Sequence, residues 1–166
     1  TPGTSTSLSG TADDSSVVLS WTAPTDTGGS AITDYTVESS SDSGTTWTTF
    51  ADGTSTTASV RVTGLTNGTA YVFRVTAVNA QGSGTATAAS SAVTPVTTPT
   101  VASSVAGTAG DTQVALIWTA TTDNGGSAIT DYTVESSSDS STWTTFVDGT
   151  STTASDQFRW NRLAAC

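Results

Sequence analysis

The sequence copies itself once, and this repeat limits the folds that the chain can adopt. The segment "SWTAPTDTGGSAITDYTVESSSDSGTTWTTFADGTSTTAS" (20–59) returns as "IWTATTDNGGSAITDYTVESSSDSSTWTTFVDGTSTTAS" (117–155). Trp21 aligns with Trp118, an offset of 97 residues that falls to 96 after a single deletion. A period of this length is too long for a solenoid repeat and is the size of a β-sandwich domain.

The repeat predicts two domains of unequal length. The first covers 1–97, and the second matches it over 98–155. After the shared letters "GTSTTAS", the second copy continues as "DQFRWNRLAAC", so 156–166 form a tail with no counterpart in the first repeat. The intervening "TPVTTPT" contains Pro95 and Pro99 and predicts an extended, fairly stiff connector.

Two explanations fit the abrupt change after the shared letters. In the first, a truncation or a shifted reading frame interrupts a longer array. The second repeat contains no basic residue up to Ser155, and Arg159 and Arg162 then follow closely. In the second explanation, the tail is a genuine C-terminus that folds against the first repeat or against a partner.

The tail itself has a strand-like pattern. Phe158 and Trp160 alternate with polar residues, as in a half-buried strand. Such a strand would stand where Val60 and Val62 stand in the first repeat. The alternative is a disordered tail.

Charge and composition exclude several functions. The net charge is −10, and the chain has no Lys and no His, so it lacks the basic clusters that nucleic acids and anionic membranes attract. Without His, Ser–His and Cys–His catalysis is excluded. The single Cys166 excludes an intrachain disulfide and a cysteine zinc site, and no apolar run approaches the ~20 residues of a membrane span. We therefore expect no catalytic residue, no cofactor or metal, no nucleic-acid partner and no membrane insertion.

Short apolar runs between turn residues predict an all-β module in the first repeat. The longest run places Tyr71, Phe73, Val75 and Ala77 on one strand face. The strands are expected at 16–21, 31–39, 45–50, 57–65, 69–80 and 85–94.

Several of these residues occur in a familiar order. Trp21 is followed by Pro24, then by "ITDYTVE", and "GLTNGTAYVFRVTAVN" closes the repeat. This order resembles a fibronectin type III domain over nearly all of 1–97. The resemblance implies an immunoglobulin-like Greek-key β-sandwich of seven strands without a disulfide, with Tyr71 as the family's tyrosine corner. The core that the resemblance implies is Trp21, Tyr35, Val37, Leu65, Tyr71, Phe73 and Val75.

The second repeat lacks the later half of this pattern. In the first repeat that half supplies six large core side chains, and burial of each contributes ~1.5–3 kcal/mol, or roughly 9–18 kcal/mol together. A whole domain is usually stable by only ~5–15 kcal/mol. We therefore expect 98–155 to be the N-terminal part of an incomplete domain, which does not fold as an independent sandwich and exposes strand edges. The six side chains are Val60, Val62, Leu65, Tyr71, Phe73 and Val75.

The acidic residues give no clear catalytic or metal site. Asp34 and Glu38 lie ~13 Å apart along one strand, beyond the ~5–9.5 Å that separates glycosidase carboxylates, so they are interpreted as solvated. Asp26, Asp123 and Asn124 offer too few oxygens for calcium and are interpreted as turn formers.

Three further residues have two interpretations each. Asn67 begins the glycosylation acceptor pattern Asn-Gly-Thr, but an ordinary turn is preferred. Trp47 and Trp143 are candidate ligand contacts, because exposed aromatic rings can stack on sugars, although core or half-buried packing is preferred.

The resemblance then suggests a function. Bacterial secreted proteins use arrays of such domains beside enzymatic or adhesive ones. We expect a non-enzymatic spacer or interaction module from an extracellular or cell-surface array, with other domains of a longer polypeptide as partners. The alternative is an accessory module of a secreted enzyme or adhesin that binds a polysaccharide or a cell-surface protein.

Overall fold

A computed structural model describes residues 1–147 and 149–159. Two compact units make up the chain, one over Thr1–Thr97 and one that begins at Thr98. Every regular element in the described residues is a β-strand, which confirms the predicted all-β class.

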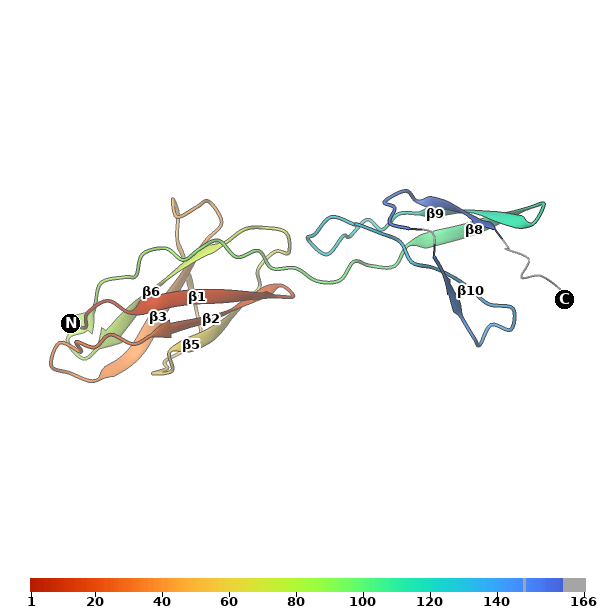
Figure 1. Ribbon diagram of the computed structural model, residues 1–166. Helices are drawn as coiled ribbons and strands as arrows, with labels where there is room; N and C mark the ends of the chain where they lie inside the picture. The colour runs from red at the N-terminus through yellow and green to blue at the C-terminus, as the bar shows by residue number, and fades with distance from the viewer. Residues whose placement is uncertain (148, 160–166) are drawn as a thin grey trace. The chain divides into compact units, whose positions relative to one another are not determined.

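The first unit contains seven strands in two antiparallel sheets (Figure 1). One sheet has the order β1-β2-β5 and the other β4-β3-β6-β7. Their bounds are β1 Thr6–Asp13, β2 Ser16–Thr22, β3 Ile32–Ser40, β4 Thr48–Phe50, β5 Ser59–Thr63, β6 Val72–Asn79 and β7 Gly82–Ser83.

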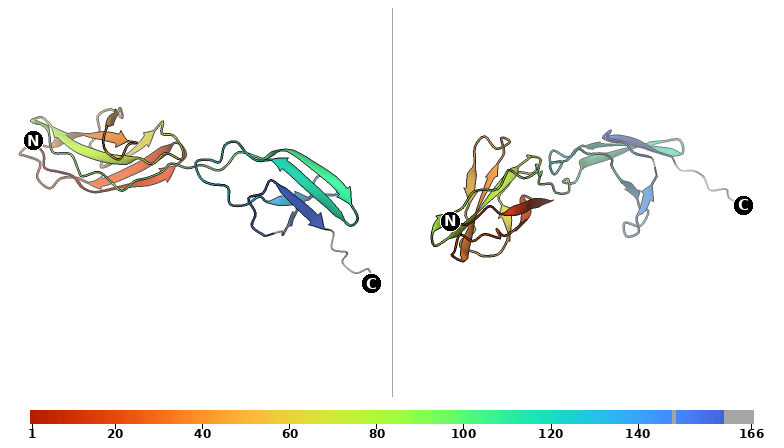
Figure 2. Two further views of the ribbon diagram at one scale, coloured as in Figure 1. Left: turned by 90° about the horizontal axis from the view of Figure 1, so that it is seen from above. Right: turned by 60° about the vertical axis from the view of Figure 1, so that its left-hand side comes forward.

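The core of the first unit lies between these sheets, which form two layers in Figure 2. Apolar and polar residues alternate along the central strands, so each strand turns one face inward. Trp21 of β2 meets Tyr35 of β3 edge to face, with ring centroids 5.1 Å apart. The fully enclosed side chains from both sheets include Val17, Leu19, Val37, Val62, Phe73 and Val75.

The first strand is absent from the sequence prediction. β1 contains a single large apolar residue, Leu8, and its side chains are mostly exposed. Its position comes from backbone pairing with β2, for example Gly10 opposite Leu19. Period-2 hydrophobicity therefore gives no signal for this strand.

The last predicted strand, 85–94, is wrong as a regular strand. The N–H group of Thr87 donates to the carbonyl of Val75, and the N–H group of Ser90 donates to the carbonyl of Phe73. The two donors are three residues apart along the chain, whereas the two acceptors on β6 are two residues apart. In return, the N–H groups of Val75 and Phe73 donate to the Thr87 and Ser90 hydroxyls, at 3.1 and 3.0 Å. Side-chain oxygens thus replace carbonyls along this edge, so a small, hydroxyl-rich sequence completes the sheet without an extended ladder.

The connector prediction needs one correction. Pro95 is buried in the first unit, and its carbonyl accepts a hydrogen bond from Gly68 N at 2.9 Å. The first unit therefore includes this proline.

The second unit has five strands in its described residues, in two separate sheets. Figure 1 shows β10 in a different layer from β8 and β9. One sheet has the order β12-β9-β8 and the other pairs β10 with β11. The bounds are β8 Ser103–Gly110, β9 Gln113–Thr119, β10 Val134–Ser136, β11 Thr144–Phe146 and β12 Ser155–Arg159.

The predicted strand in the tail is confirmed over Ser155–Arg159, and a disordered tail is wrong for these residues. Phe158 pairs with Val114 as Val62 pairs with Val17 in the first unit. The backbone of the tail thus takes the position of β5. Trp160, the other residue of the prediction, lies outside the described residues.

An identical sequence forms different structure in the two units. Residues 28–43 and 125–140 agree letter for letter. The first copy contains the nine-residue strand β3, which pairs with β6 on one edge and β4 on the other. The second contains the three-residue strand β10, whose only strand partner among the described residues is β11. Because the local sequence is the same, the missing neighbour accounts for the shorter strand.

Candidate functional site

Trp47 belongs to a charged cluster on the outer face of the first unit. Glu38 on β3 lies opposite Arg74 on β6, and the guanidinium binds the carboxylate with both Nε and Nη2, at 2.6 and 2.9 Å. The same guanidinium carbon lies 4.4 Å from the centroid of the Trp47 ring. The ring is half-buried. Because Arg74 lies over the ring, it covers a face that a sugar would need for stacking.

The electrostatics of this cluster follow from the same contact. The hydrogen bond from Arg74 lowers the pKa of Glu38, and the carboxylate raises the pKa of Arg74. Both side chains are partly shielded from water. A bidentate, partly shielded pair with a cation–π contact cross-links β3, β6 and the residue before β4.

The turn before Trp47 explains why β4 begins later than predicted. Asp42 accepts hydrogen bonds from the N–H groups of Thr45 and Thr46 and from the Ser40 hydroxyl. These bonds, above all the one from Ser40, hold the pKa of Asp42 well below its usual range. Asp139 organises the equivalent turn of the second unit in the same way, and its pKa is lowered as well.

Trp143, the counterpart of Trp47, is 61% exposed, so the preferred interpretation of core or half-buried packing is wrong for this residue. It borders a groove of about 350 Å³ in the second unit. Trp118 and Tyr132 meet edge to face at 5.3 Å in this groove, as Trp21 and Tyr35 do in the first unit. Among the described residues of the second unit, Val134 is the one hydrophobic side chain that is classed as buried. The groove is lined by Ala102, Val105, Leu116, Trp118, Tyr132, Thr133, Val134, Glu135 and Trp143.

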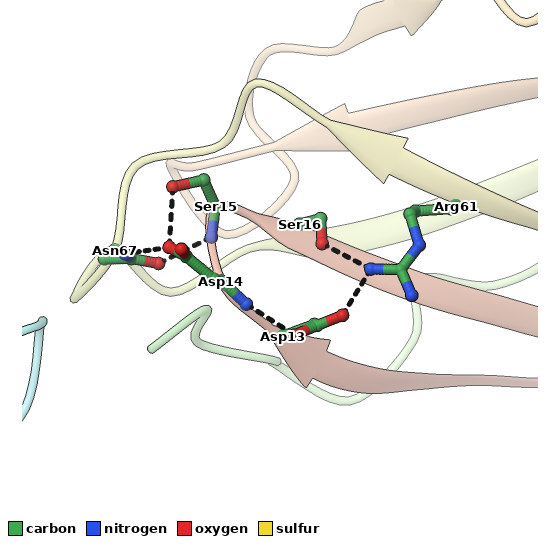
Figure 3. Close-up of polar contacts among 6 residues, drawn as sticks. All are labelled: Asp13, Asp14, Ser15, Ser16, Arg61 and Asn67. Atoms are coloured by element: carbon green, nitrogen blue, oxygen red, sulfur yellow. Dashed lines mark hydrogen bonds and ion pairs between the residues drawn. The ribbon is translucent and has the colours of Figure 1, made fainter. Parts of the chain in front are cut away.

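A polar corner closes the opposite sheet of the first unit (Figure 3). Asn67 accepts a hydrogen bond from Ser15 N at 2.9 Å and donates to Asp14 at 2.8 Å. Arg61 donates to Asp13 and to the Ser16 hydroxyl. These contacts hold the turn between β1 and β2 against the turn that precedes β6.

Hydrogen bonds within this corner lower the pKa values of its carboxylates and engage the Asn67 amide. The pKa of Asp13 is lowered mainly by its hydrogen bond from Arg61, and the pKa of Asp14 mainly by its bond from Asn67. The Asn67 amide that a glycan would modify is the group that donates to Asp14. The turn interpretation of Asn67 is therefore the one that the structure supports.

The other acidic candidates are also engaged in turns and loops. Asp26 and Asp123 accept hydrogen bonds from the N–H groups two residues later, at 2.8 and 2.9 Å, which confirms their role as turn formers. Asp34 accepts a bond from Ser55 N at 2.9 Å, and Glu38 is held by Arg74. No group of three or more metal-ligating side chains comes together within residues 1–147 and 149–159.

The predicted core residues are not all equally enclosed. Trp21, Tyr35, Val37, Phe73 and Val75 are buried, whereas Leu65 and Tyr71 are half-buried and pack against the core. The Tyr71 hydroxyl accepts a hydrogen bond from Thr66 N at 3.2 Å, which is the bond of a tyrosine corner.

Sequence reasoning missed the role of Arg74. The first repeat has two basic residues, Arg61 and Arg74, and each sits on a strand that carries core residues on its other face. The sequence could have indicated this role, because an outward arginine on one strand pairs with an acidic residue opposite it on the neighbouring strand.

The fold and these contacts define a fibronectin type III module, and comparisons with known proteins agree. The model of the family "Fibronectin type III domain" matches residues 2–93, so the chain belongs to this family. A crystal structure of titin domains superposes with a TM-score of 0.52 and 30% identity, over 56% of this chain and 32% of that one. The FN1–FN3 domains of chicken CNTN1 superpose with a TM-score of 0.54 at 22% identity, over 95% of this chain and 56% of that one, which supports the fold alone.

One curated relative is Chitinase A1 of Niallia circulans. It is 39% identical over 143 residues, which are 80% of this chain and 18% of that protein. The chain therefore spans less than a fifth of the length of this relative. Over the residues that the structure describes, no helix is long and apolar enough to cross a membrane.

Proposed function

We propose that residues 1–97 form a non-catalytic spacer module within a longer extracellular polypeptide, and that 98–155 are the N-terminal part of a second copy. The observation that carries this proposal is the position of the two ends of the first unit. Gly3 N donates to Asp26 O near the end where β6 finishes, whereas Pro95 O accepts from Gly68 N, just before β6 begins.

The strand β6 therefore separates the entry of the chain from its exit. Its eight residues span about 26 Å at ~3.3 Å per residue. A module with ends at opposite poles adds length to a polypeptide, and its two sheets are held together by a shared apolar core. Family membership and the small share of the chitinase relative that the chain matches both support a role as one module among several.

Force spectroscopy tests the spacer role. A chain held just outside residues 3 and 95 should rupture in one cooperative step. About 90 residues at ~3.5 Å each add roughly 29 nm of contour length after the folded distance is subtracted. Gradual extension without a rupture force would contradict the proposal.

A second candidate function rests on Trp143. Its exposed ring borders an apolar groove, an arrangement that suits stacking on a sugar ring. The module would then hold a secreted enzyme or adhesin on a polysaccharide. Trp47, with Arg74 over its ring, is the matched control.

Co-sedimentation with insoluble chitin and cellulose separates the two candidates. The spacer proposal predicts that the chain stays in the supernatant with both polymers. Retention that Trp143→Ala abolishes and Trp47→Ala preserves would establish the binding module instead.

A further inference from the structure

We propose that Asn124 modifies itself: the backbone nitrogen of Gly125 attacks the side-chain amide of Asn124, and water then converts the ring that forms into aspartate or isoaspartate. This reaction needs no partner and is independent of the spacer role of the first unit. Asn124 and Gly125 lie in the turn "DNGGS" of the second unit, and the matching turn of the first unit, "DTGGS", has Thr27 in place of the asparagine. The second copy of the turn therefore carries an amide that the first copy lacks.

The attacking nitrogen is held against a carboxylate. The Gly125 N–H group donates a hydrogen bond to Asp123 Oδ1 at 2.9 Å. Gly125 is buried, so this proton is shielded from bulk water and Asp123 is positioned to receive it. A general base must lie within hydrogen-bond reach of the proton that it takes, and this contact meets that condition. Because Gly125 has no side chain, nothing on its Cα hinders the approach of the nitrogen to the amide carbon.

The amide that is attacked is held by a second hydrogen bond. Asn124 Oδ1 accepts this bond from Gly126 N at 3.0 Å, which turns the carboxamide toward the peptide that follows. Negative charge develops on Oδ1 when the nitrogen adds to Cγ, and a donor aimed at that oxygen stabilises the charge. The side chain of Asn124 is exposed, and within the described part of the chain no group bonds to its Nδ2. The amide nitrogen can therefore leave into water.

The reaction balances with water as its only co-reactant. The bond between Gly125 N and Asn124 Cγ forms as the N–H proton passes to Asp123. The Cγ–Nδ2 bond then breaks, and the departing ammonia takes that proton. Water opens the resulting succinimide ring at either carbonyl, which leaves aspartate or isoaspartate at position 124 and restores the peptide N–H. The net reaction consumes water, releases ammonia and adds a negative charge beside Asp123.

Asn67 and Gly68 form the other Asn-Gly pair of the chain, and their contacts oppose the same reaction. Gly68 N donates to the carbonyl oxygen of Pro95 at 2.9 Å, and a peptide carbonyl is a far weaker base than a carboxylate. Ser15 N and Asp14 fix the two ends of the Asn67 amide (Figure 3). The nitrogen that would have to leave is thus bound. The two pairs share a sequence and differ in the groups that surround them.

A comparison of the folded and the unfolded chain tests this proposal. The full chain is kept at neutral pH in ¹⁸O-labelled water, with and without concentrated urea, and peptide mapping by mass spectrometry follows ¹⁸O uptake at both asparagines. We expect folding to accelerate the reaction of Asn124 by about threefold or more and to slow that of Asn67 by about tenfold or more. A turn that is merely flexible would react at the unfolded rate. If folded Asn124 reacts no faster than in urea, the proposal is wrong.

A pair of variants identifies the base. Asp123→Asn keeps an oxygen that can accept the bond from Gly125 N but removes the base, so the reaction at position 124 should slow by about tenfold or more. Asp26 accepts the same bond in the first unit, from Gly28 N at 2.8 Å, and Asp26→Asn should leave the rate at Asn124 unchanged. Equal rates in the Asp123→Asn chain and the natural chain would overturn the proposal. The comparison in urea decides the question if this variant fails to fold.

Discussion

Leu19→Ala measures how much the completed sandwich stabilises the first unit. Leu19 is fully enclosed between the two sheets, and truncation of such a residue costs about 2–5 kcal/mol through lost burial and the cavity left behind. For a unit of this size, each kcal/mol lowers Tm by about 4–8 °C. A loss of about 3 kcal/mol in the free energy of unfolding, near the middle of this range, therefore lowers the Tm of the first unit by roughly 12–24 °C.

The matched control is Leu116→Ala at the equivalent position of the second unit. Leu116 is half-buried in the open groove, and the calorimetric transition of the first unit should stay within about 0.5 kcal/mol of the natural chain. Both variants are compared by differential scanning calorimetry of the full chain. A loss below about 1 kcal/mol for Leu19→Ala, or equal effects of the two variants on this transition, would refute the reasoning.

Two further predictions concern the polar contacts of the first unit. Tyr71→Phe removes the acceptor of Thr66 N and should lower the free energy of unfolding by about 0.5–1.5 kcal/mol, measured by urea titration; an unchanged midpoint would contradict a stabilising tyrosine corner. Folding lowers the pKa values of Asp13 and Glu38, so their stabilisation is present above the unfolded values and is lost as pH falls through the folded ones. Tm should therefore be level from pH 7 to 5 and fall below about pH 4, and Glu38→Gln should reduce this fall. A Tm that rises on acidification would contradict the assigned directions.

The sequence predicts the central strands because their own residues carry the signal. Along β6, buried Phe73, Val75 and Ala77 alternate with residues that are not buried, and this period is readable without a structure. The tyrosine corner and the acidic turns are equally local. Their side chains bond to groups two to five residues away.

Other elements depend on neighbours that sequence patterns do not contain. β1 and the segment 85–94 are rich in Ser, Thr, Gly and Ala, and backbone and hydroxyl bonds to adjacent strands position them. The contact of Arg74 with Trp47 joins residues from different strands and turns, so it requires the register of β3 against β6.

The two copies of one sequence show the same limit within a single chain. Tyr35 is buried in β3, whereas Tyr132, with identical local sequence, is half-buried and outside any strand. Local propensity is equal in the two copies, so the difference arises from tertiary pairing. The structure of the second copy therefore depends more on the absent counterpart of β6 than on the residues that the two copies share.

Amide exchange measured by NMR at these identical segments tests the central claim most directly. Because the local sequences agree, intrinsic exchange rates are equal, and any difference in protection reports the neighbouring strands. The backbone groups of Thr36 and Glu38 point toward β6, because Phe73 and Val75 use theirs on the opposite edge of that strand. The account predicts protection at Thr36 and Glu38 at least about a hundredfold greater than at Thr133 and Glu135. Equal protection in the two copies would contradict it.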